Sequence, residues 1–410
     1  MIAFGETPPA ITGIKISDKC TSLDTIIIDA DLMFDSNGDI GFTVKNMKAN
    51  VIDFHLEGTL RIVLKPLVTK VPLIGGVQIY FPTAPKIKFD LGGLGNLATL
   101  VGMKEKIHSV VIEKIEDILV LPNKITKSFR KEISEKELQY PNPSGVLRVH
   151  LIKAENLVNK DTGGTSDPYA KLSVSTKWFK SKTIKNDLNP KWDDFMVYFP
   201  IELLGGQELL IELFDHDRIN DDTLGHATIS AGTVAHRKQI DDMWVNLENT
   251  TTGKVKLSLS WLEVSNAMED IEILKKKESK MCLLVVFIDS CKCLKAKSGL
   301  PSPYVAMTIE SGEKQLTRIK NSTNDPIFEQ GFSFVVANPH NNKLKIEVLD
   351  SSERYCSTGD TVLGKRDIDI SHWLHMMNMG NPTSQPFELK DGNGCIMLSA
   401  KLLALKDPIV

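Results

Sequence analysis

The stretches that decide the fold are residues 160–169, KDTGGTSDPY, and residues 214–225, FDHDRINDDTLG. Each follows a segment with strand-like alternation, so both are expected in turns at one end of a β-sheet. Five of their six aspartates are candidate ligands, namely Asp161, Asp167, Asp215, Asp217 and Asp222. Two unit charges about 4 Å apart repel by roughly 4 kcal/mol at an effective dielectric of about 20, unless a cation lies between them. The two turns therefore predict a cation site.

The residue types favour calcium, which takes about six to eight oxygen ligands in flexible geometry. Gly163 and Gly164 allow the first turn to curl back, so that the two aspartates of this turn face one point. In the second turn, Asp215 and Asp217 are two residues apart and point to the same side of a strand end. Asp221 is a possible further ligand. A single aspartate in a turn is explained by turn formation alone, whereas five across two turns favour a metal site.

Outward from these turns, residues 146–264 contain seven or eight short strand signals, from VLRVHLIKAENL (146–157) to KVKLSLSWL (254–262). Such regular spacing predicts an all-β sandwich. Residues 265–280 are expected to form a linker, after which CLLVVFIDSCKCLKAKSGLPSPYVAMTI (282–309) repeats the pattern. We therefore expect a second sandwich over 281–406.

The second copy lacks most of the carboxylates of the first. Ser302 takes the place of the aspartate before the Pro-Tyr pair, Ser352 replaces one partner of Asp350, and Asp360 is out of step with Gly364. We expect no calcium binding in this copy, and a packing, protein-binding or calcium-independent lipid role instead.

Residues 1–125 predict an α/β domain, and residues 126–145 a charged, proline-bearing linker. The helix expected over 103–119 has Ile107, Val111, Ile115 and Ile118 at helical spacing. Apolar residues at even positions predict a strand with one oily face, which an ordinary protein core would explain. These residues are Ile52, Phe54, Leu56, Leu60 and Ile62.

The composition excludes several classes of protein. The chain of 410 residues is long enough for several domains, and its net charge of -3 argues against nucleic-acid binding. The sequence has no apolar run of 18 residues, so no transmembrane helix is expected within it. Six unpaired cysteines predict reduced thiols in the cytosol. No nucleophile elbow, phosphate-binding glycine loop or kinase signature occurs, so we expect no enzyme.

The segments GTSDPYAKL, LNPKWDDF and ELFDHD resemble a C2 domain of the synaptotagmin and protein kinase C type. The resemblance implies that the five aspartates bind two or three calcium ions, that the carbonyls of Lys160 and His216 contribute, and that the ions bridge to anionic phospholipid. Ile219 would insert at the loop tip. In WFKSKTIK, Lys180 and Lys182 are expected on one face of a strand, either as a phosphoinositide patch or as an ordinary solvated face.

The N-terminal segments HLEGTLRIVLKPLV (55–68) and ILVLPNKIT (118–126) resemble the synaptotagmin-like mitochondrial-lipid-binding (SMP) domain of extended synaptotagmins. The resemblance implies a partial α/β half-barrel that binds glycerophospholipid along this oily face, followed by two C2 domains. It also implies a homo- or heterodimer through this domain, with the family's membrane hairpin and the first helix and strands of the domain absent from the given sequence.

The resulting hypothesis is calcium-regulated membrane tethering and glycerophospholipid transfer on the cytosolic face of the endoplasmic reticulum and plasma membrane. One alternative is a calcium-sensing trafficking or scaffold protein without lipid transfer. Another is the regulatory part of a lipid-modifying enzyme, for which the sequence offers no catalytic constellation.

Overall fold

The fold is taken from a computed structural model of the whole chain. The structure describes most of the chain, with gaps in several loops and at both ends. The described residues are 7–17, 24–38, 40–44, 47–92, 103–161, 163–217, 221–276, 280–309, 312, 314–351, 360–376, 384–390 and 394–408.

Contacts divide the chain into two compact units, Met1–Gln139 and Tyr140–Val410. The first unit is mixed α/β. Its elements are β1 (Ala10–Ile16), β2 (Ile26–Ser36), β3 (Ile40–Val44), β4 (Met47–Leu64), β5 (Gly76–Tyr80), β6 (Lys86–Gly92), α1 (Met103–Leu119), β7 (Ile125–Ser128) and α2 (Glu135–Gln139).

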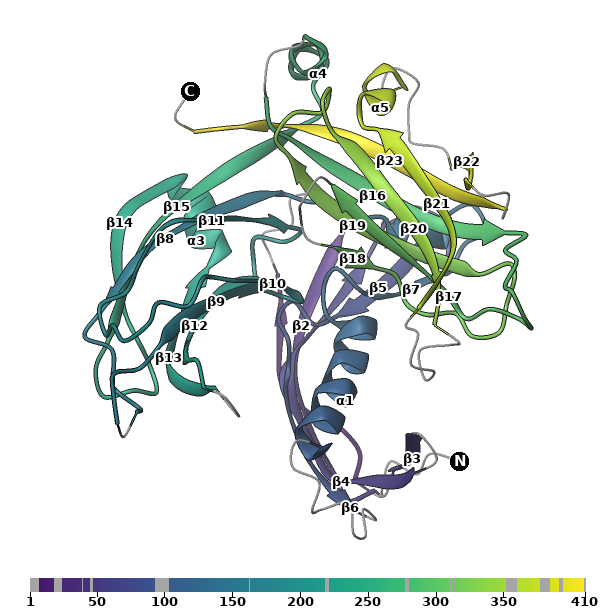
Figure 1. Ribbon diagram of the computed structural model, residues 1–410. Helices are drawn as coiled ribbons and strands as arrows, with labels where there is room; N and C mark the ends of the chain where they lie inside the picture. Colours follow the sequence, from purple (N-terminus) through teal and green to yellow (C-terminus); the bar gives the residue numbers. More distant parts are fainter. Residues whose placement is uncertain are drawn as a thin grey trace. The chain divides into compact units, whose positions relative to one another are not determined.

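One long strand organises the first unit. Strand β4 pairs with β2, β3, β5 and β6, and the main order of the seven-stranded antiparallel sheet is β1-β2-β4-β5-β7. Helix α1 runs beside β4 and β6 in Figure 1. The apolar residues Val111, Ile112 and Ile115 of α1 pack against the same core cluster as Leu56 and Phe89 of the sheet. This sheet and its helix form the expected α/β domain.

The expected oily face is only partly a closed core. Leu56 is buried, Phe54 and Leu60 are half-buried against the core, and Ile52 and Ile62 are half-buried. The strict alternation fails near residue 53, where Asp53 has φ 50° and the β4–β6 register shifts. Val51, an odd position, therefore joins the buried cluster.

Helix α1 was predicted correctly except for one residue of its core-facing side, Ile118. Ile107, Val111 and Ile115 face the core as expected, but Ile118 is 45% exposed, and Leu119 packs against the core instead. A difference of one residue rotates a side chain by about 100° around an α-helix, so a contact at the last turn is easily assigned to the wrong neighbour.

The first half of the second unit is a sandwich of sheets β10-β9-β12-β13 and β11-β8-β15, with β14 paired to β15. Its elements are β8 (Gly145–Glu155), β9 (Pro168–Val174), β10 (Lys177–Lys180), β11 (Lys191–Ile201), β12 (Glu208–Asp215), β13 (Asp222–Ser230), α3 (Ala231–Arg237), β14 (Gln239–Asn246), β15 (Lys254–Ser265) and, after the sandwich, α4 (Met268–Lys275).

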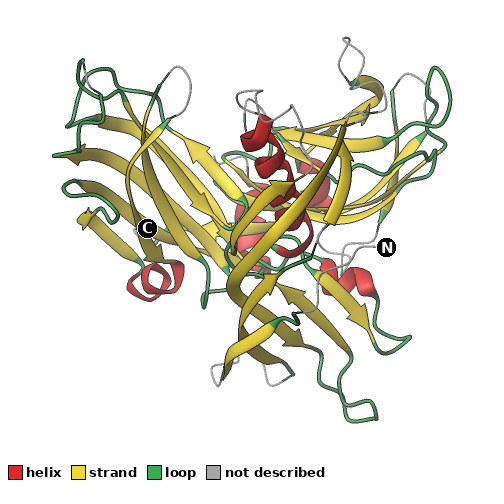
Figure 2. Ribbon diagram, turned by 90° about the horizontal axis from the view of Figure 1, so that it is seen from below, coloured by secondary structure: helices red, strands yellow, loops and turns green. Residues whose placement is uncertain are grey.

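The second half repeats this plan, with sheets β18-β17-β20-β21 and β23-β16-β19, and β22 paired to β23. Its elements are β16 (Cys282–Lys292), β17 (Pro303–Ile309), β18 (Gln315–Leu316), β19 (Ile327–Val336), β20 (Lys343–Asp350), β21 (Thr361–Asp369), α5 (Ser371–Met376), β22 (Gln385–Glu388) and β23 (Cys395–Lys406). Strands, yellow in Figure 2, far outnumber helices. The predicted duplication of an all-β sandwich is thereby confirmed.

The two sandwiches share one sheet, which the sequence did not predict. The end of β15 pairs with the end of β23, with Val264 opposite Leu405, so the strand order runs β11-β8-β15-β23-β16-β19. A separate apolar cluster that includes Val146, Leu262 and Leu283 lies beneath this junction. Arg148 Nη1 donates to Asp407 Oδ2 at 2.6 Å across it. Because backbone pairing, packing and an ion pair all cross it, the junction is part of the folded unit.

The two segments expected to be linkers are partly ordered. Most of strand β7, which pairs with β5, and all of helix α2 lie within residues 126–145, and α4 lies within residues 265–280. The domain limits 1–125, 146–264 and 281–406 stay predictions. Within the described ranges, no helix is both long and apolar enough to cross a membrane.

Candidate calcium and membrane site

The first acidic loop, between β8 and β9, is held by two polar residues that the sequence analysis missed. Asn159 Oδ1 accepts hydrogen bonds from the backbone N–H of Ser166 at 3.0 Å and from its hydroxyl at 3.1 Å. The Asn159 side-chain amide donates to the Gly164 carbonyl at 2.8 Å, and the Lys160 N–H donates to Ser166 Oγ at 2.9 Å. These bonds curl the loop, as the glycines predicted, and hold Lys160 and Asp161 on it.

Three predicted ligands are brought together at the strand ends. Asp215, at the end of β12, is directly opposite Asp222, at the start of β13. Asp215 Oδ1 accepts a hydrogen bond from the Asp167 N–H at 2.7 Å, so the first loop meets the second. A register shift lies beside this pairing, opposite Gly225, whose φ of +123° is a backbone conformation that side chains rarely adopt. The glycine therefore permits the turn that presents Asp222.

Two further hydrogen bonds from backbone N–H groups hold Asp167 in place. The His216 N–H donates to the Asp167 carbonyl at 3.0 Å, and the Asn186 N–H donates to Asp167 Oδ1 at 2.7 Å. The contact with Asn186, from a third loop, was not predicted, because no spacing in the sequence reports which amide reaches a distant carboxylate.

Asp221 has a structural role in this arrangement. Its Oδ2 accepts a hydrogen bond from the Tyr169 hydroxyl at 2.7 Å, and its Oδ1 accepts one from the Asp217 N–H at 3.0 Å. His216 Nδ1 also lies 3.1 Å from Oδ1. Burial alone would raise the pKa of Asp221, but these hydrogen bonds outweigh it and lower the pKa. Both oxygens are already used in shaping the second loop.

One oxygen atom tests whether the residues present fit a cation. Asp215 is 1% exposed, and its Oδ2 is buried without a hydrogen-bond partner. A buried, unpaired carboxylate oxygen is costly, and a bound cation would supply the missing partner. Among the described residues, no three side chains of the His, Cys, Asp or Glu type are already placed as a metal ion needs them. Mutual repulsion of the carboxylates favours such an open arrangement until a cation draws them in. The donor set fits calcium.

The acidic cluster shifts the pKa of one member. Desolvation, followed by the charges of Asp215, Asp161, Asp222 and Asp221, raises the pKa of Asp217 above its ordinary value of 3.8. The ionised form of Asp217 therefore destabilises the calcium-free fold at neutral pH, and protonation relieves this cost as the pH falls through the raised pKa.

This shift predicts that calcium competes with protons at Asp217. Because calcium needs the ionised carboxylate, the calcium affinity of the chain should fall as the pH is lowered through the raised pKa of Asp217, beginning above the ordinary titration range of an aspartate. Isothermal titration calorimetry at a series of pH values measures the fall. In Asp217→Asn the affinity should be weaker but its pH dependence shallower, and an equally steep dependence in this variant would contradict the assignment.

The predicted basic strand ends earlier than expected. Strand β10 stops at Lys180, and Lys182 follows in the loop after the buried Ser181, so the two lysines do not share a strand face. Instead, Lys180 shares the exposed face of β10 with Trp178, which is 51% exposed, whereas Lys177 points to the opposite face. Lys180 Nζ lies 3.5 Å from the centroid of the Tyr169 ring, a cation–π contact. Ile219, the predicted insertion residue, lies outside the described residues.

In the N-terminal unit, aromatic rings line the half-buried face. Phe54 lies between Phe34 and Phe89, with ring centroids 6.1 Å and 6.4 Å away, and Phe89 stacks on His108 of α1 at 4.5 Å. The sequence analysis found Phe54 but missed the other three, since they belong to three different elements. Half-buried apolar side chains of this kind suit the acyl chains of a lipid.

The second sandwich reproduces the frame of the site without its ligands. The Ser302 N–H donates to Asp350 Oδ1 at 2.8 Å, which is the counterpart of the bond from Asp167 to Asp215. Thr361 is paired with Asp350 and thus takes the position of Asp222. The Tyr304 hydroxyl donates to Asp360 Oδ2, so Asp360 matches Asp221, which is why it is out of step with a ligand position. Of the five ligand positions, only that of Asp215 keeps an aspartate.

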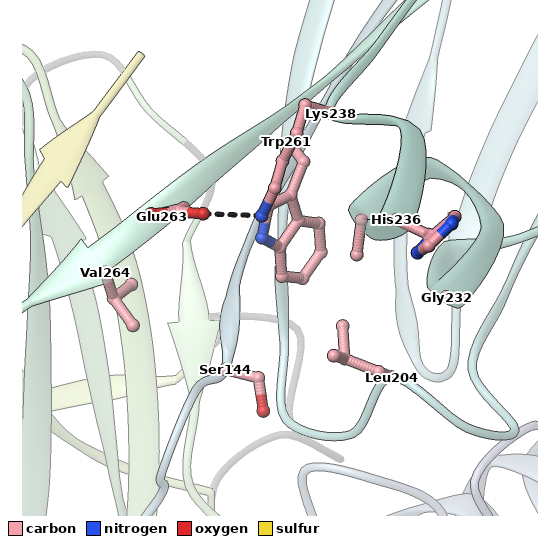
Figure 3. Close-up of a pocket in the computed structure, with 9 residues that line it drawn as sticks. Ser144, Leu204, Gly232, His236, Lys238, Trp261, Glu263 and Val264 are labelled. Carbon is pink, nitrogen blue, oxygen red and sulfur yellow. Dashed lines mark hydrogen bonds and ion pairs between the residues drawn. The ribbon is translucent and has the colours of Figure 1, made fainter. Parts of the chain in front are cut away.

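A separate pocket of about 580 Å³ lies at the opposite end of the first sandwich, beside α3 (Figure 3). Trp261 and Leu204 line it, and His236 comes from α3. At its rim, Lys238 Nζ forms an ion pair with Glu263 Oε1 at 2.5 Å. Its two charged groups satisfy each other, so we do not take this pocket as the calcium or lipid site.

Comparisons with known proteins match this arrangement of domains. Residues 145–247 and 282–389 match the C2 domain family, and residues 1–129 match the synaptotagmin-like mitochondrial-lipid-binding domain. A solved structure of extended synaptotagmin 2, comprising its SMP domain and two C2 domains, is 30% identical, with a TM-score of 0.68 over 99% of this chain and 89% of that one. The chain belongs to the extended synaptotagmin family.

The curated family members that the chain matches are longer than the chain. Extended synaptotagmin-2 of Homo sapiens is 33% identical over 92% of this chain, and that of Mus musculus is 33% identical over 98%. These alignments cover 44% and 49% of the two relatives, so the chain spans about half the length of the curated relatives that it matches. A solved structure of the same two C2 domains of extended synaptotagmin 2 is described as calcium bound; it is 32% identical, with a TM-score of 0.51 over 65% of this chain and 99% of that one.

Proposed function

We propose that this family member attaches to anionic phospholipid membranes through calcium bound to its first C2 domain, and that its SMP domain carries glycerophospholipid between membranes. Its place of action would be the cytosolic face of contacts between endoplasmic reticulum and plasma membrane. The observation that carries the proposal is the buried Asp215 Oδ2, which has no partner and lies where two acidic loops meet.

The first C2 domain would hold calcium with side chains from both loops and with two backbone carbonyls. The side chains are those of Asp161, Asp167, Asp215, Asp217 and Asp222, and the carbonyls are those of Lys160 and His216. When bound, calcium would supply positive charge and could also be coordinated by oxygen atoms of a lipid phosphate. The chain's own residues supply the order of the site, with Asp221 and Asn159 fixing the two loops.

Calcium would act on membrane binding by reversing a local charge. Without it, the carboxylate cluster repels an anionic leaflet; with it, the repulsion is removed and the loops can approach. Lys180 and Lys182 would add attraction to the same leaflet, and Ile219 would insert at the loop tip. The second C2 domain would take no part in this response, because it keeps an aspartate at only one ligand position.

The SMP domain would hold the acyl chains on the half-buried face that includes Phe54. The other predicted lipid-contacting residues are Ile52, Leu56, Leu60 and Ile62. Of these, Leu56 is buried in the core, and Ile52 lies before the register shift, where Val51 instead faces the core cluster, so Phe54, Leu60 and Ile62 carry the proposal. A homo- or heterodimer through this domain would extend the lipid path.

Native mass spectrometry of the full chain tests the lipid proposal. The purified protein should carry additional mass equal to that of a glycerophospholipid. Leu60→Trp should lower the lipid-bound fraction severalfold by filling the half-buried face. Val71→Trp is the matched control, since Val71 is 88% exposed in a loop of the same domain.

The same spectra separate the proposal from its alternative. Absence of phospholipid, together with calcium-dependent vesicle binding, would favour a calcium-sensing scaffold or trafficking protein. Equal lipid loading of Leu60→Trp and Val71→Trp would show that the half-buried face around Phe54 is not where the lipid binds.

A further inference from the structure

One loop at the end of the second C2 domain that corresponds to the calcium site carries fixed positive charge. Residues 292–302, here called the basic loop, contain Lys292, Lys295 and Lys297 and no acidic residue. Their counterpart in the first C2 domain contains two of the aspartates proposed as calcium ligands, Asp161 and Asp167. The first residues of the two loops can be compared one by one because the same contacts hold them.

Equivalent backbone bonds set this correspondence. The Asn156 N–H donates to the Asn189 side chain at 2.9 Å, and the Cys293 N–H donates to the Asp325 side chain at 2.8 Å. Asn156 and Cys293 also share an unusual positive φ, of 56° and 57°.

One residue further on, the buried Leu157 and Leu294 each donate a backbone bond, at 3.1 Å and 3.0 Å. Counting from these leucines, Ser298 takes the place of Asp161, and Lys297 that of Lys160. The acidic position of the first loop is therefore neutral in the second, where Lys295 adds a further cation in place of Val158.

The local packing determines which way the lysines point. Leu294 is buried, and Ala296 packs against the core of the second sandwich, whereas Lys295 and Lys297, which alternate with them, are exposed. Among the residues that the structure describes, none forms an ion pair with Lys292, Lys295 or Lys297. Their charges are therefore available to a partner outside the chain.

An apolar side chain stands at the tip of the same loop. Leu300 is 56% exposed, and it follows Gly299, whose φ of +66° forms the turn. The Thr323 N–H donates to the Pro301 carbonyl at 2.8 Å and fixes the far side of the loop. An exposed leucine flanked by unpaired lysines matches the interface of a bilayer, where the apolar group enters the headgroup region and the lysines meet lipid phosphates.

We propose that the basic loop of the second C2 domain is a calcium-independent contact with anionic phospholipid membranes. Lys295 and Lys297 provide permanently the positive charge that the first C2 domain gains from calcium, and Leu300 inserts between headgroups. The chain would then have one constitutive and one calcium-controlled membrane contact.

Vesicle sedimentation of the full chain in EGTA tests this contact. The chain should bind vesicles of phosphatidylcholine with phosphatidylserine, should not bind phosphatidylcholine alone, and should dissociate as salt is raised. Lys295→Gln with Lys297→Gln should weaken binding by about 25-fold, since a basic residue near an anionic surface contributes about 1 kcal/mol, or about fivefold. Leu300→Ser should weaken it further at constant charge.

The matched control is Lys280→Gln with Lys343→Gln, two exposed lysines at the opposite end of the same sandwich. The control for Leu300→Ser is Leu316→Ser, because Leu316, in β18, is 48% exposed. Equal binding of the basic-loop variant and its control, or no binding of the wild-type chain in EGTA, would overturn the proposal.

The outcome is independent of the calcium proposal. Asp215→Asn with Asp217→Asn should leave binding in EGTA in place. A chain that binds vesicles only with calcium would keep the calcium proposal and overturn the constitutive contact.

Discussion

Replacing Asp215 and Asp217 together by asparagine is expected to abolish the increase in vesicle binding that calcium causes. Asp215 supplies the buried oxygen without a partner, and the pKa of Asp217 is raised by desolvation and then by the neighbouring carboxylates. Two charges are removed from a set of five, and the remaining three cannot neutralise and enclose the ions. Calcium affinity should fall by at least 100-fold, since each carboxylate lost from a calcium site costs on the order of one to a few kcal/mol.

The double variant should be more stable than wild type when calcium is absent. Asparagine keeps the shape of aspartate and removes the repulsion within the cluster, so the melting temperature in EGTA should rise. Calcium should raise the melting temperature of wild type and leave that of the variant unchanged. Thermal unfolding with and without calcium measures both effects.

The matched control for this variant is Asp241→Asn with Asp242→Asn. These aspartates lie on β14, in the other sheet of the same sandwich. The control should sediment with calcium as wild type does. Calcium-dependent sedimentation of Asp215→Asn with Asp217→Asn at the wild-type level would show that the site is wrongly assigned.

Replacing Trp192 by alanine is expected to destabilise the first C2 domain, so that it unfolds at a lower denaturant concentration than in wild type. Trp192 is fully buried, and its indole N–H donates to the Lys182 carbonyl at 2.9 Å. Truncating a buried tryptophan to alanine costs about 3–5 kcal/mol, which is a large part of the stability of a domain of this size. Hydrogen exchange should show lost protection in β9 and β11, and calcium-dependent vesicle binding should fall with it.

Trp192→Phe separates the ring from the hydrogen bond. The counterpart of Trp192 in the second C2 domain is Phe328, which is 4% exposed, so this frame accepts a phenylalanine. The variant should lose about 1–3 kcal/mol, mainly because the Lys182 carbonyl loses its donor. Wild-type exchange protection in Trp192→Ala would contradict the assigned role, and equal losses in both variants would assign the effect to the hydrogen bond alone.

The sequence predicted those features that local pattern determines. Strand-like alternation and the repeated motif predicted both sandwiches, and the spacing of Asp215 and Asp217 placed them together at a strand end. It could not predict the role of Asp221, because its partner Tyr169 is distant in the sequence. It also missed Asn159 and Ser166, since small polar residues in loops do not reveal which backbone groups they bind.

In the N-terminal domain, too, the local sequence pattern predicts the structure only in part. Alternation correctly predicted that β4 has an apolar face, but Asp53, with its positive φ, interrupts the period and brings Val51 into the core. The pairing of β15 with β23 joins residues more than a hundred positions apart, at the ends of two otherwise complete sheets. No local pattern specifies such a contact, because pairing at strand ends depends on how the two sandwiches dock.

The shared sheet has a mechanical consequence. Where two domains are joined only by a flexible segment, tension straightens the segment before either domain turns. Here a pull on the acidic loops of the first C2 domain reaches the second through the hydrogen bonds around Val264 and Leu405. The two domains are therefore expected to turn together, and not independently, when either of them is loaded.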